Sequence, residues 1–145
     1  MNKNIEIEIQ LTNNNASVPS RKHDSDIGYD ISSSVDALIT SKEVQLINTG
    51  IAISLPNQCA GFVLPRSGLA SKNKITLINS PGLIDPGYTG ELMVPLINHG
   101  STDYQISIGD RIAQLVLINT NSVEFKIVEN LPDTERSTGG FGSTD

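Results

Sequence analysis

The sequence contains no tryptophan and only three phenylalanines and three tyrosines among its 145 residues. Large aromatic side chains therefore cannot dominate the interior. Hydrophobic residues still make up 37% of the chain, so isoleucine, leucine and valine must build the core. This length is sufficient for one domain with a sizeable core, and neither an internal repeat nor a second domain is visible.

Cysteine and histidine are also scarce. The single cysteine, Cys59, cannot form a disulfide within the chain, and its apolar surroundings in the sequence indicate a buried, inert thiol. The two histidines, His23 and His99, lie far apart, so we do not expect a dedicated zinc site. A lone thiol fits a reducing compartment, and the first residues lack a signal-peptide core. We therefore expect a cytoplasmic protein.

Positive charge and long apolar runs are lacking as well. The chain has ten basic and 16 acidic residues, which gives a formal net charge of -6. This balance argues against a protein held on nucleic acid by bulk electrostatics, although a small anion can still be bound locally. No apolar run is long enough to span a membrane. We expect neither nucleic acid nor a membrane as a partner.

The apolar residues that are present recur at every second position or in short runs, which is typical of β-strands. Alternation at residues 5, 7, 9 and 11 predicts a half-buried strand. The runs 44–47 and 51–55 predict a hairpin around Asn48-Thr49-Gly50. Further strands are predicted over 60–64, 75–78, 92–98, 104–108, 112–118 and 123–128. Many short strands separated by turn residues predict an all-β barrel or sandwich.

Polar chemistry is concentrated between these strands. The segment Gly28-Tyr29-Asp30-Ile31, taken alone, is typical of an Asx turn before a strand. In Pro65-Arg66-Ser67-Gly68-Leu69-Ala70, the proline ends a strand and a short helix is predicted to begin near Ser67 and to include Lys72. Ser67 is either a plain N-cap or part of an anion site that uses backbone N–H groups and its hydroxyl.

Two further segments carry candidate site residues. Between residues 79 and 91, two Pro-Gly turns hold Asp85, which either orients a water as a general base or satisfies backbone N–H groups of the turn. Tyr88, nearby, is either a platform for a sugar or an edge aromatic. Gln114 interrupts an otherwise apolar strand, and such an amide requires either a hydrogen-bond partner in the core or a ligand.

The last ten residues, 136–145, combine six polar or charged side chains with three glycines around Phe141. No strand or helix favours that composition. Phe141 offers a ring for stacking on a base, and the glycines leave backbone N–H groups accessible to phosphate oxygens. Arg136 adds a guanidinium suited to a phosphate. The alternative is a disordered tail with an incidental phenylalanine.

These five segments occur in one order: Gly-Tyr-Asp, Pro-Arg-Ser-Gly-Leu-Ala, Ile-Asp-Pro-Gly-Tyr-Thr-Gly-Glu, Gly-Asp-Arg-Ile-Ala-Gln-Leu and the glycine-rich tail. Together they resemble the signature motifs of the trimeric dUTP pyrophosphatases, from about Pro19 to Thr144. The resemblance implies a distorted jelly-roll β-barrel with one short helix, in a homotrimer with active sites at subunit interfaces. The barrel domain would span 1–131, and 132–145 would form a flexible C-terminal arm that crosses to a neighbour and closes the site.

The resemblance also implies a reaction, in which dUTP and water give dUMP and pyrophosphate. This lowers dUTP and supplies dUMP for thymidylate synthesis. Asp85 would orient the attacking water, and Asp30 would hold waters on a Mg²⁺ that chelates the triphosphate. Tyr88 would pack under the deoxyribose and exclude a 2′-hydroxyl. The remaining implied substrate-binding residues are Arg66, Ser67, Gly68 and Gln114 for phosphates, Asn79 for uracil, and Arg136, Phe141, Gly142, Ser143 and Thr144 in the arm.

Two other functions remain open on the sequence. The dCTP deaminases share this fold and the Ile-Asp-Pro-Gly motif, but they need a glutamate on the following strand. Pro95 stands at the aligned position, and Glu91 is expected in the turn. A non-catalytic nucleotide-binding regulatory trimer would not require Asp85. Ser137 and Asp145 depart from the family pattern where glycine is usual, which bears on closure of the arm.

Overall fold

The computed structural model describes residues 6–134. These residues form ten strands and one seven-residue helix. The strands are β1 (Glu8–Leu11), β2 (Tyr29–Ser32), β3 (Ala37–Ile39), β4 (Val44–Ser54), β5 (Cys59–Leu64), β6 (Ile75–Leu77), β7 (Gly82–Ile84), β8 (Glu91–Asn98), β9 (Tyr104–Ile106) and β10 (Arg111–Asn119), and the helix is α1 (Ser67–Asn73).

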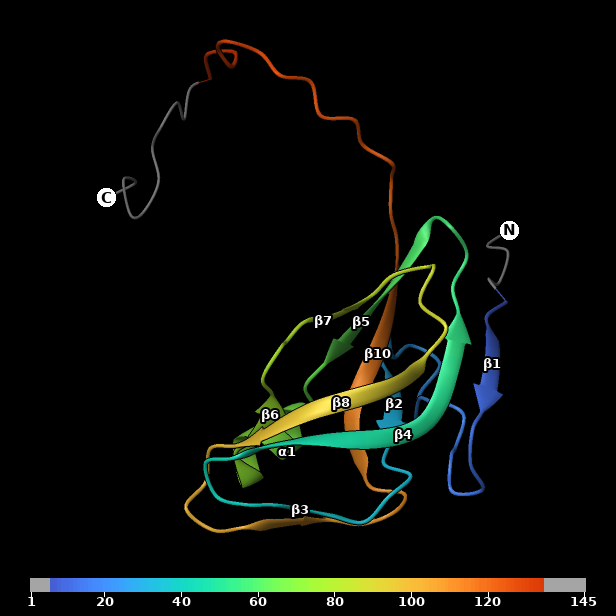
Figure 1. Ribbon diagram of the computed structural model, residues 1–145, viewed down its shortest axis with the longest axis vertical. Coiled ribbons are helices and arrows are strands. Elements are labelled where there is room, and N and C mark those ends of the chain that lie inside the picture. Colours follow the sequence, from blue (N-terminus) through green and yellow to red (C-terminus); the bar gives the residue numbers. More distant parts are fainter. Residues whose placement is uncertain (1–5, 135–145) are drawn as a thin grey trace.

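The strands form two four-stranded antiparallel sheets that share one core. The orders are β1-β4-β8-β6 and β2-β10-β5-β7, and β3 pairs separately with β9. Figure 1 shows β4 and β8 lying across β5 and β10. Buried aliphatic side chains from both sheets, such as Ile47, Leu96, Val63 and Leu115, belong to a single cluster. The predicted all-β class, the aliphatic core and the short helix are confirmed.

The predicted hairpin around Asn48-Thr49-Gly50 is wrong. Residues 44–54 form one eleven-residue strand, β4, and its pairing with β8 shifts register between Asn48 and Ala52. Gly50 takes a left-handed φ of 69° at this irregularity. Its N–H donates to Oε1 of Glu91 over 2.8 Å. The turn-forming residues are therefore accommodated as a bulge within a strand rather than as a reversal of the chain.

The predicted strand over 123–128 is also absent. Within residues 6–134, this segment pairs with no other strand, and beyond β10 the chain runs away from the two sheets (Figure 1). Phe125 is 93% exposed and Ile127 98%. The alternation that predicted a strand is present in the sequence, but within residues 6–134 this segment neither pairs with a strand nor buries its apolar side chains.

Three short strands were not predicted. β2 contains the acidic Asp30, and β7 begins at the glycine of a Pro-Gly pair, so both segments have the composition of turns. β3 contributes only three residues and pairs with β9. Their pairing to longer strands outweighs weak local propensity. Cys59 is buried at the start of β5, as predicted. In the described part of the chain, no helix is long and apolar enough to cross a membrane.

Candidate active site

Strand pairing gathers the first group of candidate residues around the middle of β10. Gln114 is paired with Asp30 of β2 on one side and with Leu64 at the end of β5 on the other. The chain then continues from Leu64 through Arg66 into α1. Three segments that are far apart in sequence therefore meet at Gln114. They line a cavity of about 490 Å³ that includes Asp30, Arg66, Ser67, Gly68, Arg111 and Gln114, which we call the polar pocket.

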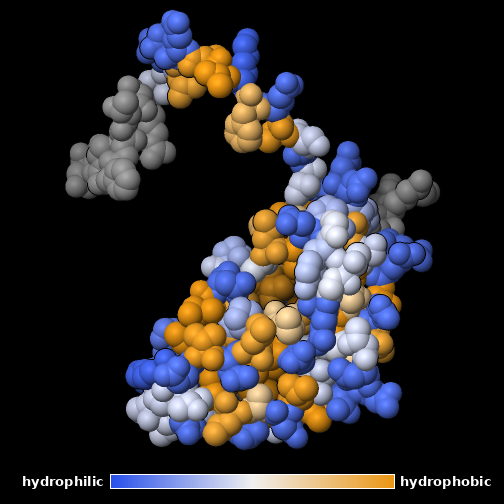
Figure 2. Space-filling model, viewed as in Figure 1, coloured by the Kyte–Doolittle hydropathy of each residue, from blue (hydrophilic) through white to orange (hydrophobic). Residues whose placement is uncertain are grey.

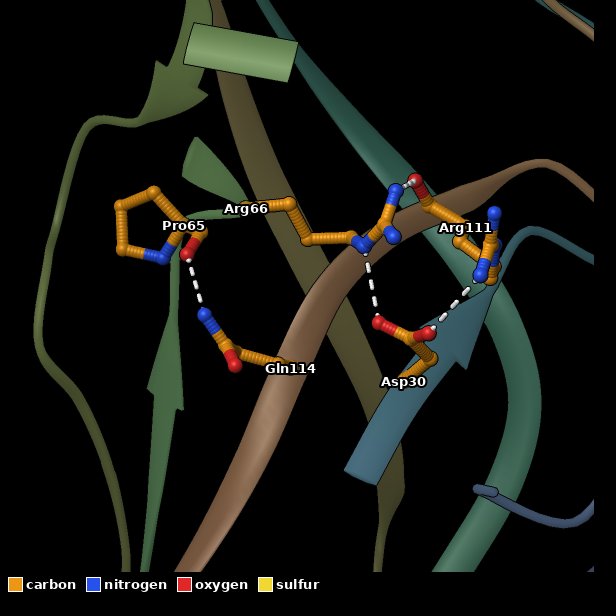
Figure 3. A network of polar contacts seen from close by, with 5 residues as sticks. All are labelled: Asp30, Pro65, Arg66, Arg111 and Gln114. Carbon is orange, nitrogen blue, oxygen red and sulfur yellow. Dashed lines mark hydrogen bonds and ion pairs between the residues drawn. The ribbon is translucent and has the colours of Figure 1, made fainter. Parts of the chain in front are cut away.

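Asp30 lies between two arginines in the polar pocket (Figure 3). Its Oδ1 accepts from Nε of Arg66 over 2.8 Å, and its Oδ2 accepts from Nη1 of Arg111 over 3.2 Å. Arg66 also donates to the backbone oxygen of Arg111 over 3.4 Å. The side chains of Asp30 and Arg66 are 21% and 28% exposed, and that of Arg111 is 53% exposed. The pair with Arg66 is thus the less solvated of the two.

Arg111 was not among the predicted site residues, although it stands in the Gly-Asp-Arg motif. Residues 111 and 114 are three apart, so a regular strand would place them on opposite faces of the sheet. The pairing of β10 with β2 shifts register between Arg111 and Ala113. An inserted residue at such a bulge returns the two side chains to one face. Both line the polar pocket as a result.

Gln114 is held by one hydrogen bond and by one close approach. Its Nε2 donates to the backbone oxygen of Pro65 over 2.8 Å (Figure 3). Its Oε1 faces Gly28, where an added Cβ would lie only 2.2 Å away. The amide is half-buried rather than fully buried. The partner that the sequence required is therefore the end of β5, and Gly28 provides the space.

Ser67 and Gly68 begin α1 at the edge of the polar pocket, and both are exposed. The N-cap residue is Arg66, which makes no side-chain capping bond, so the alternative of Ser67 as a plain N-cap is not what the helix shows. A Cβ at Gly68 would meet nothing within 4 Å. The backbone there is open to a ligand. Lys22 and His23, which the sequence reasoning did not single out, also line this pocket.

The second group of candidate residues surrounds a different cavity of about 350 Å³, lined mostly by apolar residues of β7 and β8, which we call the apolar pocket. Asn79, Asp85 and Tyr88 all line it. Asp85 follows β7 and is exposed. Within residues 6–134 its carboxylate makes no hydrogen bond or ion pair, so the alternative role of satisfying turn N–H groups is not what this loop shows. Only its backbone oxygen is engaged, by the N–H of Tyr88.

Glu91 is the first residue of β8 and not part of the turn, contrary to the prediction. Its Oε1 accepts from the N–H of Gly50 over 2.8 Å and from Nδ2 of Asn48 over 3.2 Å. Its backbone oxygen accepts from the hydroxyl of Tyr88 over 2.8 Å. Glu91 therefore fastens the loop that carries Asp85 and Tyr88 to the bulge of β4. Pro95 lies further along β8.

The two pockets share no lining residue. Residues that the motifs predict to act together therefore line two different pockets of one chain. The predicted arm residues Arg136, Phe141, Gly142, Ser143 and Thr144 lie outside the described residues. The described residues that precede them run away from the sheets and carry apolar side chains along their length (Figure 2).

The polar pocket suits a metal ion that takes most of its ligands from water and substrate phosphates rather than from side chains. Among residues 6–134, no three His, Cys, Asp or Glu side chains gather as a metal-binding group. Mg²⁺ commonly keeps several waters and uses one or two carboxylates together with substrate phosphates. Each oxygen of Asp30 accepts one arginine hydrogen bond, and a carboxylate offers about four acceptor positions. Asp30 thus retains capacity to accept from metal-bound waters.

Known proteins resemble this chain over most of its length. A family model described as dUTPase matches residues 14–145. A Tropheryma whipplei (strain Twist) protein named deoxyuridine 5'-triphosphate nucleotidohydrolase is 51% identical over 130 residues, 87% of each chain. A mutant dUTPase of Staphylococcus bacteriophage 80alpha, solved with dUpNHpp, has a TM-score of 0.90 and 30% identity and covers 95% of this chain and 97% of its own. A mutant dUTPase from phage phi11 of S. aureus, with a structural Mg(II) ion, has a TM-score of 0.84 and 29% identity over 89% of this chain and 100% of its own.

Proposed function

Because the chain belongs to the dUTPase family, we propose that it hydrolyses dUTP to dUMP and pyrophosphate, and so lowers dUTP while supplying dUMP for thymidylate synthesis. One observation carries the proposal. Asp85 lines the apolar pocket beside Asn79 and Tyr88, and its carboxylate has no partner within residues 6–134. A carboxylate in that position can orient a water and accept its proton. The water oxygen bonds to the α-phosphorus while the bond to the bridging oxygen of the β-phosphate breaks.

The apolar pocket is the proposed site for uracil and deoxyribose. Asn79 and neighbouring backbone groups read the uracil edge, since a site built to pair with polar groups rejects a base that presents the wrong pattern. Tyr88 packs against the sugar and leaves no room for a 2′-hydroxyl. The apolar residues of β7 and β8 enclose the rest of the nucleoside. This division fits small-molecule sites in general, which combine an apolar lining with a few placed polar groups.

The polar pocket is the proposed site for the triphosphate. Ser67, the backbone of Gly68 and Gln114 contact the phosphoryl groups, and Arg66 contributes positive charge. Phosphoryl transfer depends more on positioning and charge neutralisation than on covalent chemistry. Asp30 would hold Mg²⁺ through water, and the ion, when bound, neutralises charge on the triphosphate. The phage phi11 relative coordinates a structural Mg(II) ion.

The proposed working unit is a homotrimer, because a single chain places the residues for the nucleoside and those for the triphosphate in two different pockets. The nucleoside and its triphosphate are one molecule, yet the two pockets have no residue in common. We propose that the apolar pocket of one subunit faces the polar pocket of the next. The exposed Phe125 and Ile127 pack on a neighbour, and the arm closes the site with Arg136, Phe141, Gly142, Ser143 and Thr144.

Neither alternative function has comparable support. A dCTP deaminase needs a proton-transferring residue near the nucleobase, but Pro95 cannot transfer a proton. The carboxylate of Glu91 is already bonded to Gly50 and Asn48. A regulatory nucleotide-binding trimer does not explain why the loop presents, beside the nucleoside pocket, an Asp85 carboxylate that has no partner within residues 6–134.

The direct test is release of pyrophosphate from dUTP, dCTP, dTTP and UTP in the presence of Mg²⁺. We expect rapid release from dUTP alone. The Asp85→Asn variant should fold and bind a non-hydrolysable dUTP analogue while losing roughly 10²–10⁴-fold in turnover. Asp103→Asn, an exposed aspartate outside both pockets, is the matched control. Ammonia release from dCTP, or full turnover by the Asp85→Asn variant, would contradict the proposal.

A further inference from the structure

Tyr88 is held by three contacts with neighbouring residues of the segment 85–91. Its N–H donates to the backbone oxygen of Asp85 over 3.0 Å, and its hydroxyl donates to the backbone oxygen of Glu91 over 2.8 Å. The third contact is with Gly90, which lies against the edge of the ring. A Cβ at residue 90 would lie 2.8 Å from the hydroxyl oxygen, 2.9 Å from Cζ and 3.2 Å from Cε2 of Tyr88.

The backbone does not itself demand glycine at residue 90. In the described part of the chain, the glycines with left-handed φ are Gly50 and Gly109. A side chain at Gly90 is therefore compatible with the backbone and is opposed by the tyrosine ring. At Gly87, three residues earlier in the loop, a Cβ would meet nothing within 4 Å, so the tyrosine ring does not oppose a side chain there.

We infer that Gly90 is a specificity-determining position. Because residue 90 has no side chain, the Tyr88 ring can lie directly against it, in the position where the ring excludes a ribose 2′-hydroxyl. This inference rests on the proposed function. An enzyme pocket that must reject one added hydroxyl typically reaches only about 10²-fold discrimination by contact alone. The excluding wall must therefore hold its position, since a shift of about 1 Å can change a rate by a similar factor.

A methyl group at residue 90 moves the tip of the ring rather than the backbone. Carbon atoms that are not bonded settle at about 3.5–4.0 Å, so the Tyr88 ring must move by up to about 1 Å from the alanine Cβ. Tyr88 is 45% exposed, so its ring can move without disturbing the core. Its hydroxyl then leaves the backbone oxygen of Glu91, and the boundary of the sugar site becomes loose.

The experiment compares kcat/KM for dUTP and for UTP in the native protein, Gly90→Ala and Gly87→Ala. We expect the dUTP/UTP ratio to fall at least about tenfold in Gly90→Ala, chiefly through a gain in UTP hydrolysis and a loss in dUTP hydrolysis. Gly87→Ala should keep the native ratio, because its methyl group enters open space. Equal ratios in all three proteins would overturn the inference.

A double-mutant cycle shows whether Gly90 acts through Tyr88. In a Tyr88→Ala background, Gly90→Ala should have no further effect on the ratio, because the ring it displaces is absent. An undiminished effect in that background would overturn the inference. If Gly90→Ala fails to fold, Tyr88→Phe tests the same anchoring, since it removes the bond to Glu91 but keeps the ring. It should lower the ratio, and an unchanged ratio would again overturn the inference.

These outcomes separate the inference from the function on which it rests. A native protein that releases no pyrophosphate from dUTP contradicts the proposed function. A native protein that is selective for dUTP, together with a Gly90→Ala variant of the same selectivity, contradicts only the role of Gly90. A native protein that hydrolyses dUTP and UTP equally well contradicts the sugar gate and, with it, this inference.

Discussion

The side-chain oxygen of Gln114 lies so close to Gly28 that a methyl group there would be 2.2 Å from it. An alanine at residue 28 must push the amide away from the backbone oxygen of Pro65, to which Nε2 now donates over 2.8 Å. The displaced amide would also lose its proposed hydrogen bond to a charged phosphoryl group, which is worth about 1.5–3 kcal/mol. We therefore predict that Gly28→Ala lowers kcat/KM for dUTP by roughly tenfold to a hundredfold, measured by steady-state pyrophosphate release. In a Gln114→Ala background the same substitution should cost little more, and an equal additional loss would refute this coupling.

The two arginines on Asp30 should differ in importance. Arg66 makes the shorter hydrogen bond to Asp30 and is the less exposed of the two arginines. Arg111 is half exposed, and its Nη1 lies 3.2 Å from Oδ2 of Asp30. An exposed pair of the second kind contributes less than about 1 kcal/mol to stability. We predict that Arg66→Lys weakens binding of a non-hydrolysable dUTP analogue more than Arg111→Lys does, because lysine cannot reproduce the guanidinium geometry. Titration calorimetry at fixed Mg²⁺ measures both, and the reverse order would show that Arg111 is the main partner of Asp30.

Glu91 should stabilise the fold through the bulge of β4. Its carboxylate accepts two hydrogen bonds, one of them from the backbone of Gly50, and Glu91→Ala leaves both donors without a partner. Loss of a partner for a buried donor costs about 1–3 kcal/mol. We predict a decrease of that size in the free energy of unfolding for Glu91→Ala, and a smaller decrease for Glu91→Gln, which keeps an acceptor. Denaturation at one protein concentration checks this, and equal stability of all three proteins would contradict it.

We expect the exposed apolar side chains that alternate with polar ones after β10 to hold the proposed trimer together. Phe125 and Ile127 are almost fully exposed in one chain, and burial of such side chains is worth about 1.5–3 kcal/mol each. We predict that Phe125→Ser combined with Ile127→Ser shifts the sedimenting species at micromolar concentration from about three chain masses toward one. Lys126→Ser, which lies between them, is the matched control. A double variant that sediments as the native protein does would show that these residues take no part in assembly.

The sequence predicted the fold where local pattern and pairing agree. β5, β8 and β10 all lie within one residue of the ranges that alternation and apolar runs predicted. The pattern failed where a long-range contact decides the structure. Asn48-Thr49-Gly50 has the composition of a turn, but Glu91 and Leu92 of β8 satisfy its polar groups inside a strand. No reading of residues 44–55 alone could reveal that contact.

The candidate site, like the fold, was predictable from the sequence only in part. Every candidate residue that the motifs gave within residues 6–134 lines one of the two pockets. The motifs did not identify Arg111, since only the bulge in β10 brings it to the face that carries Gln114. Gly28 and Gly90 were also missed as positioning residues. Their importance lies in side chains that pack over them, Gln114 and Tyr88, and a glycine in a motif does not disclose its neighbour.

The division of the site between two subunits is tested most directly by mixing two impaired variants. Asp85→Asn damages the apolar pocket only, and Gln114→Ala damages the polar pocket only. Each mixed trimer then contains one interface at which two intact pockets meet. Random association in equal amounts should restore about a quarter of the native pyrophosphate release from dUTP. If the co-refolded mixture is no more active than its two parents, the two pockets do not combine across subunits and the account is wrong.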